Sequence, residues 1–220
     1  MAKKAKKVDL TKSALIIVDV QNDFCPGGSL AVPHGDEVVA PLNQMIGLFA
    51  KNDCPVFASR DWHPTNTKHF AAFGGKWPSH CVKHTVGADF HKDLELRLNT
   101  FVVSKGMSEN EDEKSYSAFG GVAIEPVYDL GWAEIIGYFP RNLLKDMNIK
   151  NLFVGGLATD YCVKATVLDA LKLGFKVYLL EDACRAVNIK PTDGADAIAE
   201  MKKIGKENFV LTSAREVLGK

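Results

Sequence analysis

Six short runs of apolar and β-branched residues recur along the chain, and they constrain the fold more than any other feature. The runs cover Ala14–Val18, Pro55–Ser59, Phe101–Ser104, Leu152–Gly156, Phe175–Leu180 and Phe209–Thr212. Within each run the apolar residues are continuous and do not alternate with polar ones, which is typical of strands buried on both faces of a parallel sheet. The pattern therefore predicts a mostly parallel, six-stranded sheet.

Amphipathic helical patterns lie between these runs. Apolar residues recur at helical spacing over residues 38–49 and again over 163–171, so each segment presents one apolar stripe to a sheet. Strands that alternate with helices predict a three-layer, Rossmann-like α/β fold with helices on both faces of the sheet. No repeat or linker is evident, so we expect one domain over residues 13–220 after a flexible basic tail at 1–12.

Two stretches have no clear assignment in this scheme. Residues 61–91 are loop-like and rich in histidine, and residues 106–140 are crowded with glycine, acidic and aromatic residues. The second stretch could hold a short helix or a hairpin. Long irregular segments in a compact domain are usually functional, so both are candidates for a role in a site.

The composition limits the kinds of partner that the protein can bind. The 27 Lys and Arg balance the 27 Asp and Glu, so no overall field attracts nucleic acid or anionic lipid, and a small neutral ligand fits better. The apolar run at 14–18 is far shorter than the ~20 residues of a membrane span, and the basic residues 1–7 lack the features of a secretory signal. We therefore expect a cytoplasmic protein with neither a membrane nor a nucleic-acid partner.

Reactive side chains follow four of the predicted strands. Asp19 and Asp61 come at the ends of the first two strands, Lys105 at the end of the third, and Cys162 shortly after the fourth. Ligands of open parallel sheets bind beyond the carboxyl ends of the strands. An acid, a possible metal ligand, a cation and a thiol are therefore expected to meet at one edge.

Cys162 is a candidate nucleophile. It falls in the first turn of a predicted helix that Thr159 or Asp160 would cap, where the helix dipole lowers the pKa of a thiol. Lys105 would stabilise the thiolate, and Asp19 would accept the thiol proton and return it to a leaving amine. Judged singly, the same residues could be an inert core cysteine, a solvated lysine and a turn aspartate.

The loop-like stretch also contains a candidate metal site. Its candidate ligands are Asp61, His63, His69 and His80. One carboxylate with three imidazoles suits Zn²⁺, Mn²⁺ or Fe²⁺ more than Ca²⁺ or Mg²⁺. On spacing alone, His84 or His91 could replace His80, or all of these histidines could be surface residues. The five cysteines contain no Cys-x-x-Cys pair, which argues against a disulfide framework and a zinc ribbon.

Six segments of the chain together resemble the nicotinamidases of the isochorismatase-like cysteine hydrolases. In one-letter code they are VDVQNDFC (18–25), DWHP (61–64), WPSHC (77–81), KG (105–106), SYSAF (115–119) and GLATDYCV (156–163). They follow the order of the family over about residues 14–185, and as a set they are highly specific. The resemblance implies deamidation of nicotinamide to nicotinate in NAD salvage, and hydrolysis of pyrazinamide.

The resemblance also implies roles for individual residues. The nucleophile would be Cys162, with Asp19 as general acid/base and Lys105 as the third catalytic residue. One divalent transition metal would bind Asp61, His63, His69 and His80. Zinc is the simplest choice, with manganese or iron as alternatives. The remaining histidines, His34, His84 and His91, would then have no role.

The same resemblance places Phe24, Trp77 and Tyr116 around the pyridine ring. It implies a cis peptide between Leu157 and Ala158 that directs backbone N–H groups of Ala158 and Cys162 at the carbonyl oxygen of the substrate.

The chain departs from the family at two places. Residues 121–140 have no counterpart, which leaves substrate access and a possible homo-oligomer contact open, and Tyr161 replaces a histidine found beside the nucleophile in some relatives. Two rival functions are an amidase acting on N-carbamoyl or ureido groups, which needs no metal loop, and a non-catalytic metal-binding or thiol-sensing protein on the same fold. Metal content and ammonia release from nicotinamide discriminate among them.

Overall fold

The computed structural model describes residues 10–110, 116–124 and 140–220. Residues 1–9 of the expected tail and residues 125–139 of the segment without a counterpart lie outside these ranges. Residues 10–12, which the sequence assigns to the tail, contact the domain: Leu10 packs against the core, and the Lys12 carbonyl accepts hydrogen bonds from the backbone of Lys150 (2.8 Å) and Asn151 (3.1 Å).

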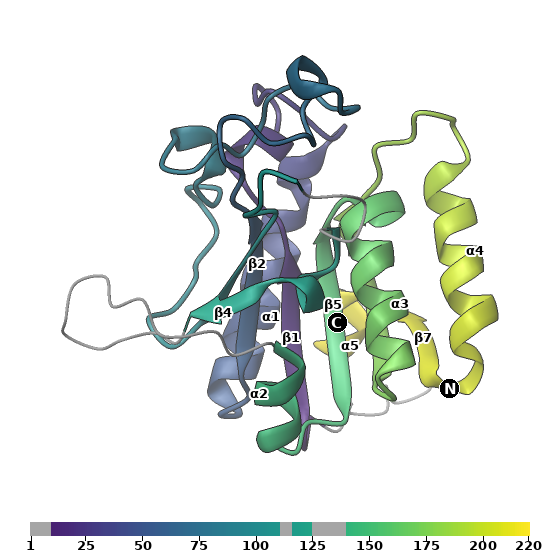
Figure 1. The fold of residues 1–220 in the computed structure, drawn as a ribbon. Coiled ribbons are helices and arrows are strands. Elements are labelled where there is room, and N and C mark those ends of the chain that lie inside the picture. Colours follow the sequence, from purple (N-terminus) through teal and green to yellow (C-terminus); the bar gives the residue numbers. More distant parts are fainter. Residues whose placement is uncertain (1–9, 111–115, 125–139) are drawn as a thin grey trace.

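A seven-stranded sheet in the order β4-β3-β2-β1-β5-β6-β7 forms the centre of the domain (Figure 1). The strands are β1 Ser13–Val18, β2 Val56–Asp61, β3 Phe101–Lys105, β4 Val122–Ile124, β5 Asn151–Leu157, β6 Lys176–Arg185 and β7 Phe209–Thr212. The six predicted strands are all present and parallel to one another. The α/β prediction is therefore confirmed, and the short edge strand β4, which pairs antiparallel with β3, is an addition to it.

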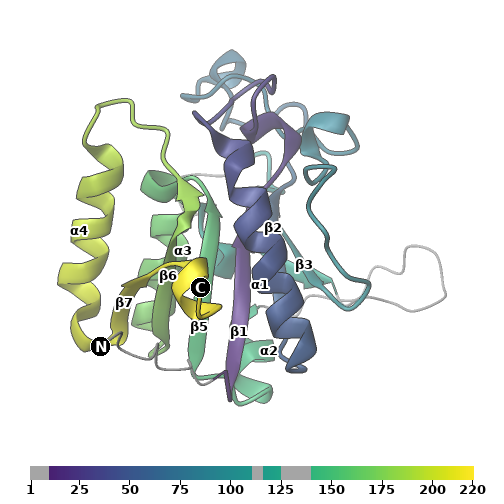
Figure 2. The ribbon, with the colours of Figure 1, turned by 180° about the vertical axis from the view of Figure 1, so that it is seen from behind.

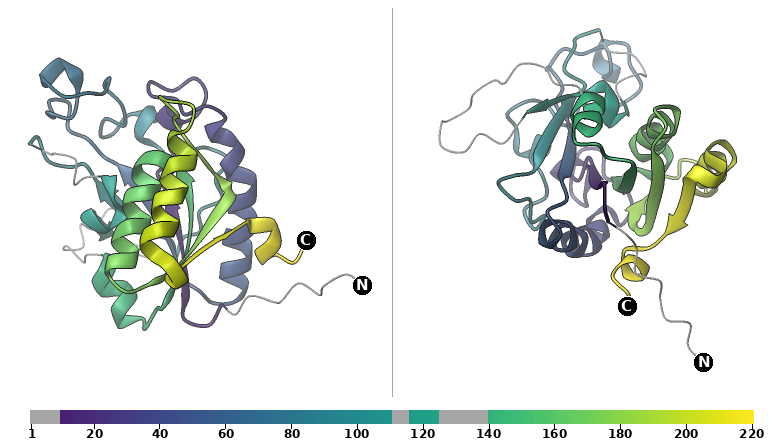
Figure 3. Two further views of the ribbon diagram at one scale, coloured as in Figure 1. Left: turned by 90° about the vertical axis from the view of Figure 1, so that its right-hand side faces the viewer. Right: turned by 90° about the horizontal axis from the view of Figure 1, so that it is seen from below.

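Helices cover both faces of the sheet. They are α1 Val39–Lys51, α2 Pro140–Asp146, α3 Lys164–Lys172, α4 Asp193–Gly205 and α5 Ala214–Val217. Figures 1 and 2 show α3 and α4 on one face and α1 with α5 on the other, and the left view of Figure 3 shows the sheet between these layers. None of the described helices is both long and apolar enough to span a bilayer.

Each helical layer closes a hydrophobic core against the sheet. On one face Leu42 and Phe49 of α1 pack in a cluster with Leu15 and Phe153, and on the other face Val167 of α3 belongs to a cluster with residues of β1, β5 and β6. The stripes predicted over 38–49 and 163–171 thus face the sheet. Every residue of β1 is buried, which explains why its apolar run does not alternate.

The segment between β2 and β3 is a long loop, as predicted. Within the described residues, this loop contains two short 3₁₀ turns, Ala71–Phe73 and Val86–Ala88. Other 3₁₀ turns are Asn22–Phe24, Gly35–Val38, Ala118–Gly120 and Lys206–Asn208, and a π-helical turn, Thr159–Val163, leads into α3. The long loop gathers at the carboxyl ends of the central strands (Figure 1), which is where parallel sheets bind ligands.

Candidate active site

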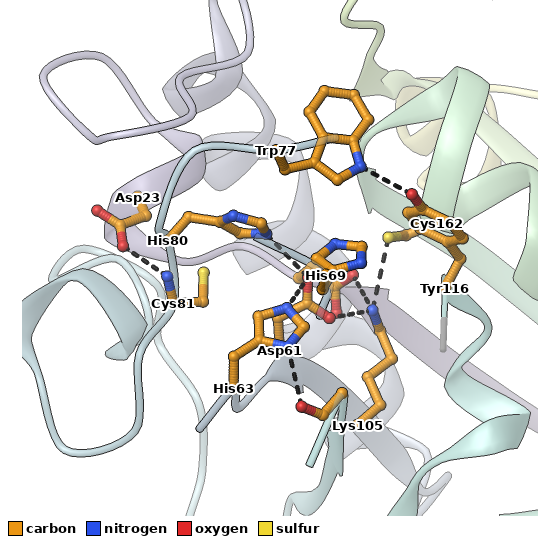
Figure 4. Close-up of polar contacts among 12 residues, drawn as sticks. Asp23, Asp61, His63, His69, Trp77, His80, Cys81, Lys105, Tyr116 and Cys162 are labelled. Carbon is orange, nitrogen blue, oxygen red and sulfur yellow. Dashed lines mark hydrogen bonds and ion pairs between the residues drawn. The ribbon is translucent and has the colours of Figure 1, made fainter. Parts of the chain in front are cut away.

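Strand register brings four charged or reactive side chains together at this edge. Asp61 of β2 and Lys105 of β3 are paired in register, and the Lys105 ammonium hydrogen-bonds to the Asp61 carboxylate. Lys105 Nζ also lies 2.9 Å from Asp19 Oδ2. The same nitrogen lies 3.5 Å from Cys162 Sγ (Figure 4). The structure therefore brings together the four side chains that were expected to meet at this edge.

Asp19 is held by the strand beside it. Its backbone adopts a left-handed conformation with φ of 49° at the end of β1, and its side chain is fully buried. Ser59 of β2 donates its hydroxyl to Asp19 Oδ1 at 2.7 Å and accepts the Asp19 N–H on its carbonyl oxygen at 3.1 Å. The sequence motifs do not single out Ser59, although a hydroxyl at the end of an otherwise apolar strand is a usable signal.

Burial sets the protonation of this group. It raises the pKa of Asp19, against the attraction of Lys105, and it raises the pKa of the Cys162 thiol well above its usual value. Burial also acts to raise the pKa of Asp61, but Lys105 and His63 outweigh it and the pKa falls. The expectation that a helix dipole lowers the thiol pKa is therefore wrong, because burial beside two carboxylates is the larger effect.

The turn that carries Cys162 differs from the expected helix start. Cys162 lies in the π-helical turn before α3, and the carbonyl of Ala158 accepts hydrogen bonds from the backbone of Tyr161 and Val163, both 3.1 Å long. The predicted cap is wrong: the Asp160 carboxylate instead accepts two 2.9 Å bonds from the backbone N–H groups of residues 187 and 188. The predicted cis peptide between Leu157 and Ala158 is present.

Three histidines converge beside the group formed by Asp19, Lys105 and Cys162. His63, His69 and His80 each offer a ring nitrogen within 4.8 Å of the others (Figure 4). Asp61 Oδ2 faces the same group, 3.6 Å from His63 Nε2 and 3.9 Å from His80 Nε2. Asp61 therefore lies between the two clusters, with one oxygen toward Lys105 and the other toward the histidines.

The donor set fits a transition metal. His63 Nε2 is buried without a hydrogen-bond partner among the described residues, while the other ring nitrogens of His63 and His80 contact the carbonyl oxygens of Gly106 (2.9 Å) and Pro78 (2.8 Å). Such outer contacts orient metal-binding imidazoles. Burial and the neighbouring histidines lower the pKa of His69 to about 4, and burial lowers that of His80, which favours the neutral rings that bind metals.

The remaining histidines lie away from this cluster. His84 contacts the ring of Trp62 edge-on, with ring centroids 5.1 Å apart, and His34 pairs with Glu37 on the surface. His91 is partly exposed, and its ring accepts a hydrogen bond from the backbone of residue 93. Of the alternatives left open by spacing, His80 is thus the one that joins His63 and His69.

A pocket is bordered by Cys162 and by two of the histidines, His69 and His80. Its lining residues are Phe24, Leu30, Val32, Asp61, His69, Trp77, His80, Tyr116, Leu157, Ala158, Tyr161, Cys162 and Val187. Trp77 Nε1 donates a 2.8 Å hydrogen bond to the Tyr116 hydroxyl, and the rings of Trp77 and Tyr161 meet edge-on at 5.2 Å. The three aromatic residues predicted to hold a ring therefore line one pocket, whereas Leu30, Val32, Tyr161 and Val187 were not predicted to do so.

The walls of this pocket suit a small, flat ring that carries one polar group. Most of the lining side chains are apolar or aromatic, and the other lining residues are Asp61, His69, His80 and Cys162. Such a combination is typical of a site for a small molecule. A buried thiol, a carboxylate and an ammonium in contact can perform nucleophilic acyl transfer.

Comparison with known proteins agrees with this geometry. Residues 13–121 and 141–215 match the isochorismatase domain, and these ranges contain every residue of the pocket. The nicotinamidase of Escherichia coli (strain K12) is 42% identical over 94% of this chain and 98% of its own length. Two solved structures are also similar over most of both chains. The pyrazinamidase of Pyrococcus horikoshii in complex with zinc is 37% identical with a TM-score of 0.78 and covers 92% of this chain and 99% of its own. A protein of L. infantum in complex with nicotinate is 35% identical with a TM-score of 0.79, and it covers 96% of this chain and 98% of its own.

Proposed function

Because this chain belongs to the isochorismatase family, we propose that it hydrolyses nicotinamide to nicotinate and ammonia, and pyrazinamide in the same way. The observation that carries the proposal is the contact of Lys105 with both Asp19 and Cys162 at the base of an aromatic pocket. The names of the similar proteins, which include nicotinamidases and a pyrazinamidase, support the substrate class.

The chemistry requires a nucleophile, an acid and donors for an oxyanion, because the amide leaving group is poor and the tetrahedral intermediate is charged. Asp19 accepts the proton of Cys162, and the thiolate attacks the carboxamide carbon to form a C–S bond. Backbone N–H groups of Ala158 and Cys162 stabilise the oxyanion. Asp19 then donates its proton to the amine, the C–N bond breaks and ammonia leaves.

Water completes the cycle. Asp19 accepts a proton from a water molecule, whose oxygen attacks the thioester carbon. The C–S bond breaks, Asp19 returns its proton to the Cys162 thiolate, and the acid product leaves as nicotinate after it loses its proton to solvent. Lys105 keeps its positive charge throughout, because Asp19 and Asp61 raise its pKa despite its burial. Its ammonium stabilises the thiolate form of Cys162 and keeps both groups in contact.

One divalent transition metal would bind His63, His69, His80 and Asp61. Zinc is the first choice, because imidazoles and carboxylates both bind zinc and a similar protein was solved with zinc. When bound, the metal supplies an anchor for the pyridine nitrogen, directly or through a water molecule, and so orients the amide toward Cys162.

Metal analysis tests this assignment. Purified protein is expected to contain close to one transition metal per chain, and His63→Ala or His80→Ala is expected to lose most of it. His84→Ala is the matched control, because His84 lies outside the cluster. Full occupancy in both ligand variants would show that the ligands are wrongly chosen.

Substrate choice tests the function. Ammonia release is measured with nicotinamide, pyrazinamide and benzamide, which keeps the amide and the ring shape but lacks a ring nitrogen. A polar site deprived of its partner discriminates by up to ~10⁴–10⁵-fold, so we expect kcat/KM for benzamide to be at least ~10²-fold lower. Equal values for benzamide would refute the ring anchor. No ammonia from nicotinamide, with release from an N-carbamoyl compound, would replace the proposed substrate by that of the rival amidase.

A further inference from the structure

Gln21 is a buried polar side chain that the proposed mechanism does not use. It is fully buried in the turn between β1 and α1. Its amide nitrogen donates to the carbonyl oxygens of Asp61 and Ala88, both at 2.8 Å, and its amide oxygen accepts the backbone N–H of Asp61, also at 2.8 Å. Both N–H groups and the oxygen of the amide are therefore used, and all its partners are backbone groups.

Two of these bonds go to one residue. Gln21 binds both the N–H and the C=O of Asp61, so it fixes the peptide groups on both sides of the Asp61 Cα. The direction of the Asp61 side chain follows from that backbone. The direction matters, because one carboxylate oxygen contacts Lys105 and the other faces His63 and His80.

The turn around Gln21 has a second link to the histidine cluster. Asp23 Oδ2 accepts the backbone N–H of Cys81 at 2.7 Å (Figure 4), and Cys81 follows His80 in the chain. Phe24 in the same turn lies against the His80 ring, with centroids 5.5 Å apart. The turn thus touches the backbone at or next to two of the four residues assigned to the metal.

We infer that Gln21 is a positioning residue that holds Asp61 in its metal-binding orientation before the metal arrives. The inference rests on the proposed function, because the orientation of Asp61 affects metal affinity if Asp61 and the three histidines bind a metal. Groups that orient metal ligands commonly change metal affinity by ~10–100-fold when they are removed. A glutamine that served stability alone would leave the metal affinity of the folded protein unchanged.

The chain offers a matched control for the same chemistry. Asn43 of α1 donates its amide to the Asp93 carbonyl at 2.8 Å and accepts the backbone N–H of Glu95 at 2.9 Å. It is therefore another side-chain amide that binds one carbonyl and one N–H of a neighbouring segment. Neither Asp93 nor Glu95 belongs to the metal-ligand cluster or lines the pocket.

The test compares Gln21→Met with Asn43→Leu, since each removes the amide at nearly constant size and adds no charge. Zinc dissociation constants are measured on chelator-treated protein by competition with a coloured chelator, and thermal unfolding without zinc is recorded in parallel. Both variants are expected to lower Tm, but zinc binding is expected to weaken by ~10–100-fold in Gln21→Met alone. Unchanged zinc affinity in a folded Gln21→Met, or an equal loss in Asn43→Leu, would overturn the inference.

A measurement on the native protein keeps the inference testable if Gln21→Met does not fold. The Asp61 amide is expected to exchange its hydrogen slowly in zinc-free protein, because Gln21 already holds it. Fast exchange that slows when zinc is added would contradict the inference. The proposed function is judged separately: wild-type protein that binds no zinc and releases no ammonia refutes that function, whereas failure of the Gln21 results alone refutes the positioning role.

Discussion

Replacing Lys105 by methionine removes the positive charge that two buried carboxylates share. Lys105 is 2% exposed and Asp19 is fully buried, so water compensates neither of them. With Cys162 as a thiol, the native group of Asp19, Asp61 and Lys105 carries a net charge of one negative, and the variant carries two. Methionine matches the aliphatic part of lysine, so the change tests charge and not packing.

The structure sets the scale of the effect. Two unit charges 2.9 Å apart, the distance from Lys105 Nζ to Asp19 Oδ2, attract by ~6 kcal/mol at an effective dielectric constant of ~20. Removing one partner of a buried ion pair destabilises proteins by ~3–5 kcal/mol. We therefore expect Lys105→Met to lower the free energy of unfolding of the metal-free protein by ~3–5 kcal/mol at neutral pH.

The loss is expected to depend on pH with a definite sign. Burial places the native pKa of Asp19 above its unfolded value, so between these two values the folded state binds more protons, and stability falls as pH rises. Without Lys105 the native pKa of Asp19 rises further and the window extends to higher pH. Lys105→Met is therefore expected to regain stability as pH is lowered from 8 toward 5, more steeply than wild type does.

Urea unfolding of chelator-treated protein across this pH range measures the effect. The double variant Lys105→Met/Asp19→Asn is the control, because it removes one of the two unpaired charges and is expected to recover part of the loss at pH 8. A loss below ~1 kcal/mol, the value of an exposed pair, would refute the reasoning. A loss that does not change with pH would refute the role of Asp19 in it.

Four further substitutions test three individual contacts. Gly106→Ala is expected to weaken zinc affinity by ~10-fold or more, because Gly106 has a φ of +69° and an added Cβ would collide with Cε1 of His63. Ser59→Ala is expected to move the acidic limb of the kcat/KM–pH profile to higher pH, because the hydroxyl stabilises the charged form of the proposed general base. Trp77→Phe and Tyr116→Phe remove the same 2.8 Å hydrogen bond. Each is therefore expected to raise the KM for nicotinamide by ~5-fold, which corresponds to ~1 kcal/mol. Kinetic analysis of the double variant is expected to show no further rise in KM.

Much of the fold is predictable from the sequence, because a strand buried on both faces requires a continuous apolar run. The run at 14–18 is β1 with one residue added. By contrast, β4 has three residues and lies at the edge of the sheet, where β3 is its one neighbour. The sequence therefore has no long apolar run from which β4 could be predicted. The extension of β6 to Arg185 includes Glu181 and Asp182, which apolar continuity excludes.

The site is predictable in its reactive residues and less so in their environment. Asp19, Lys105 and Cys162 are identifiable because they follow strands whose carboxyl ends meet at one edge. The raised pKa of the Cys162 thiol is not predictable from position in a helix, because it depends on burial that distant segments provide. Gln21 likewise contacts Asp61, forty positions away in the chain, so its role is visible only in the folded protein.

A rapid-quench experiment with nicotinamide tests the central claim, that Cys162 is the nucleophile of an amidase. Protein mixed briefly with nicotinamide and quenched in acid is expected to carry a nicotinoyl thioester on the peptide that contains Cys162, detected by mass spectrometry. Cys162→Ala is expected to fold, to carry no adduct and to release no ammonia. Undiminished ammonia release from Cys162→Ala, or an adduct on another residue, would contradict the account.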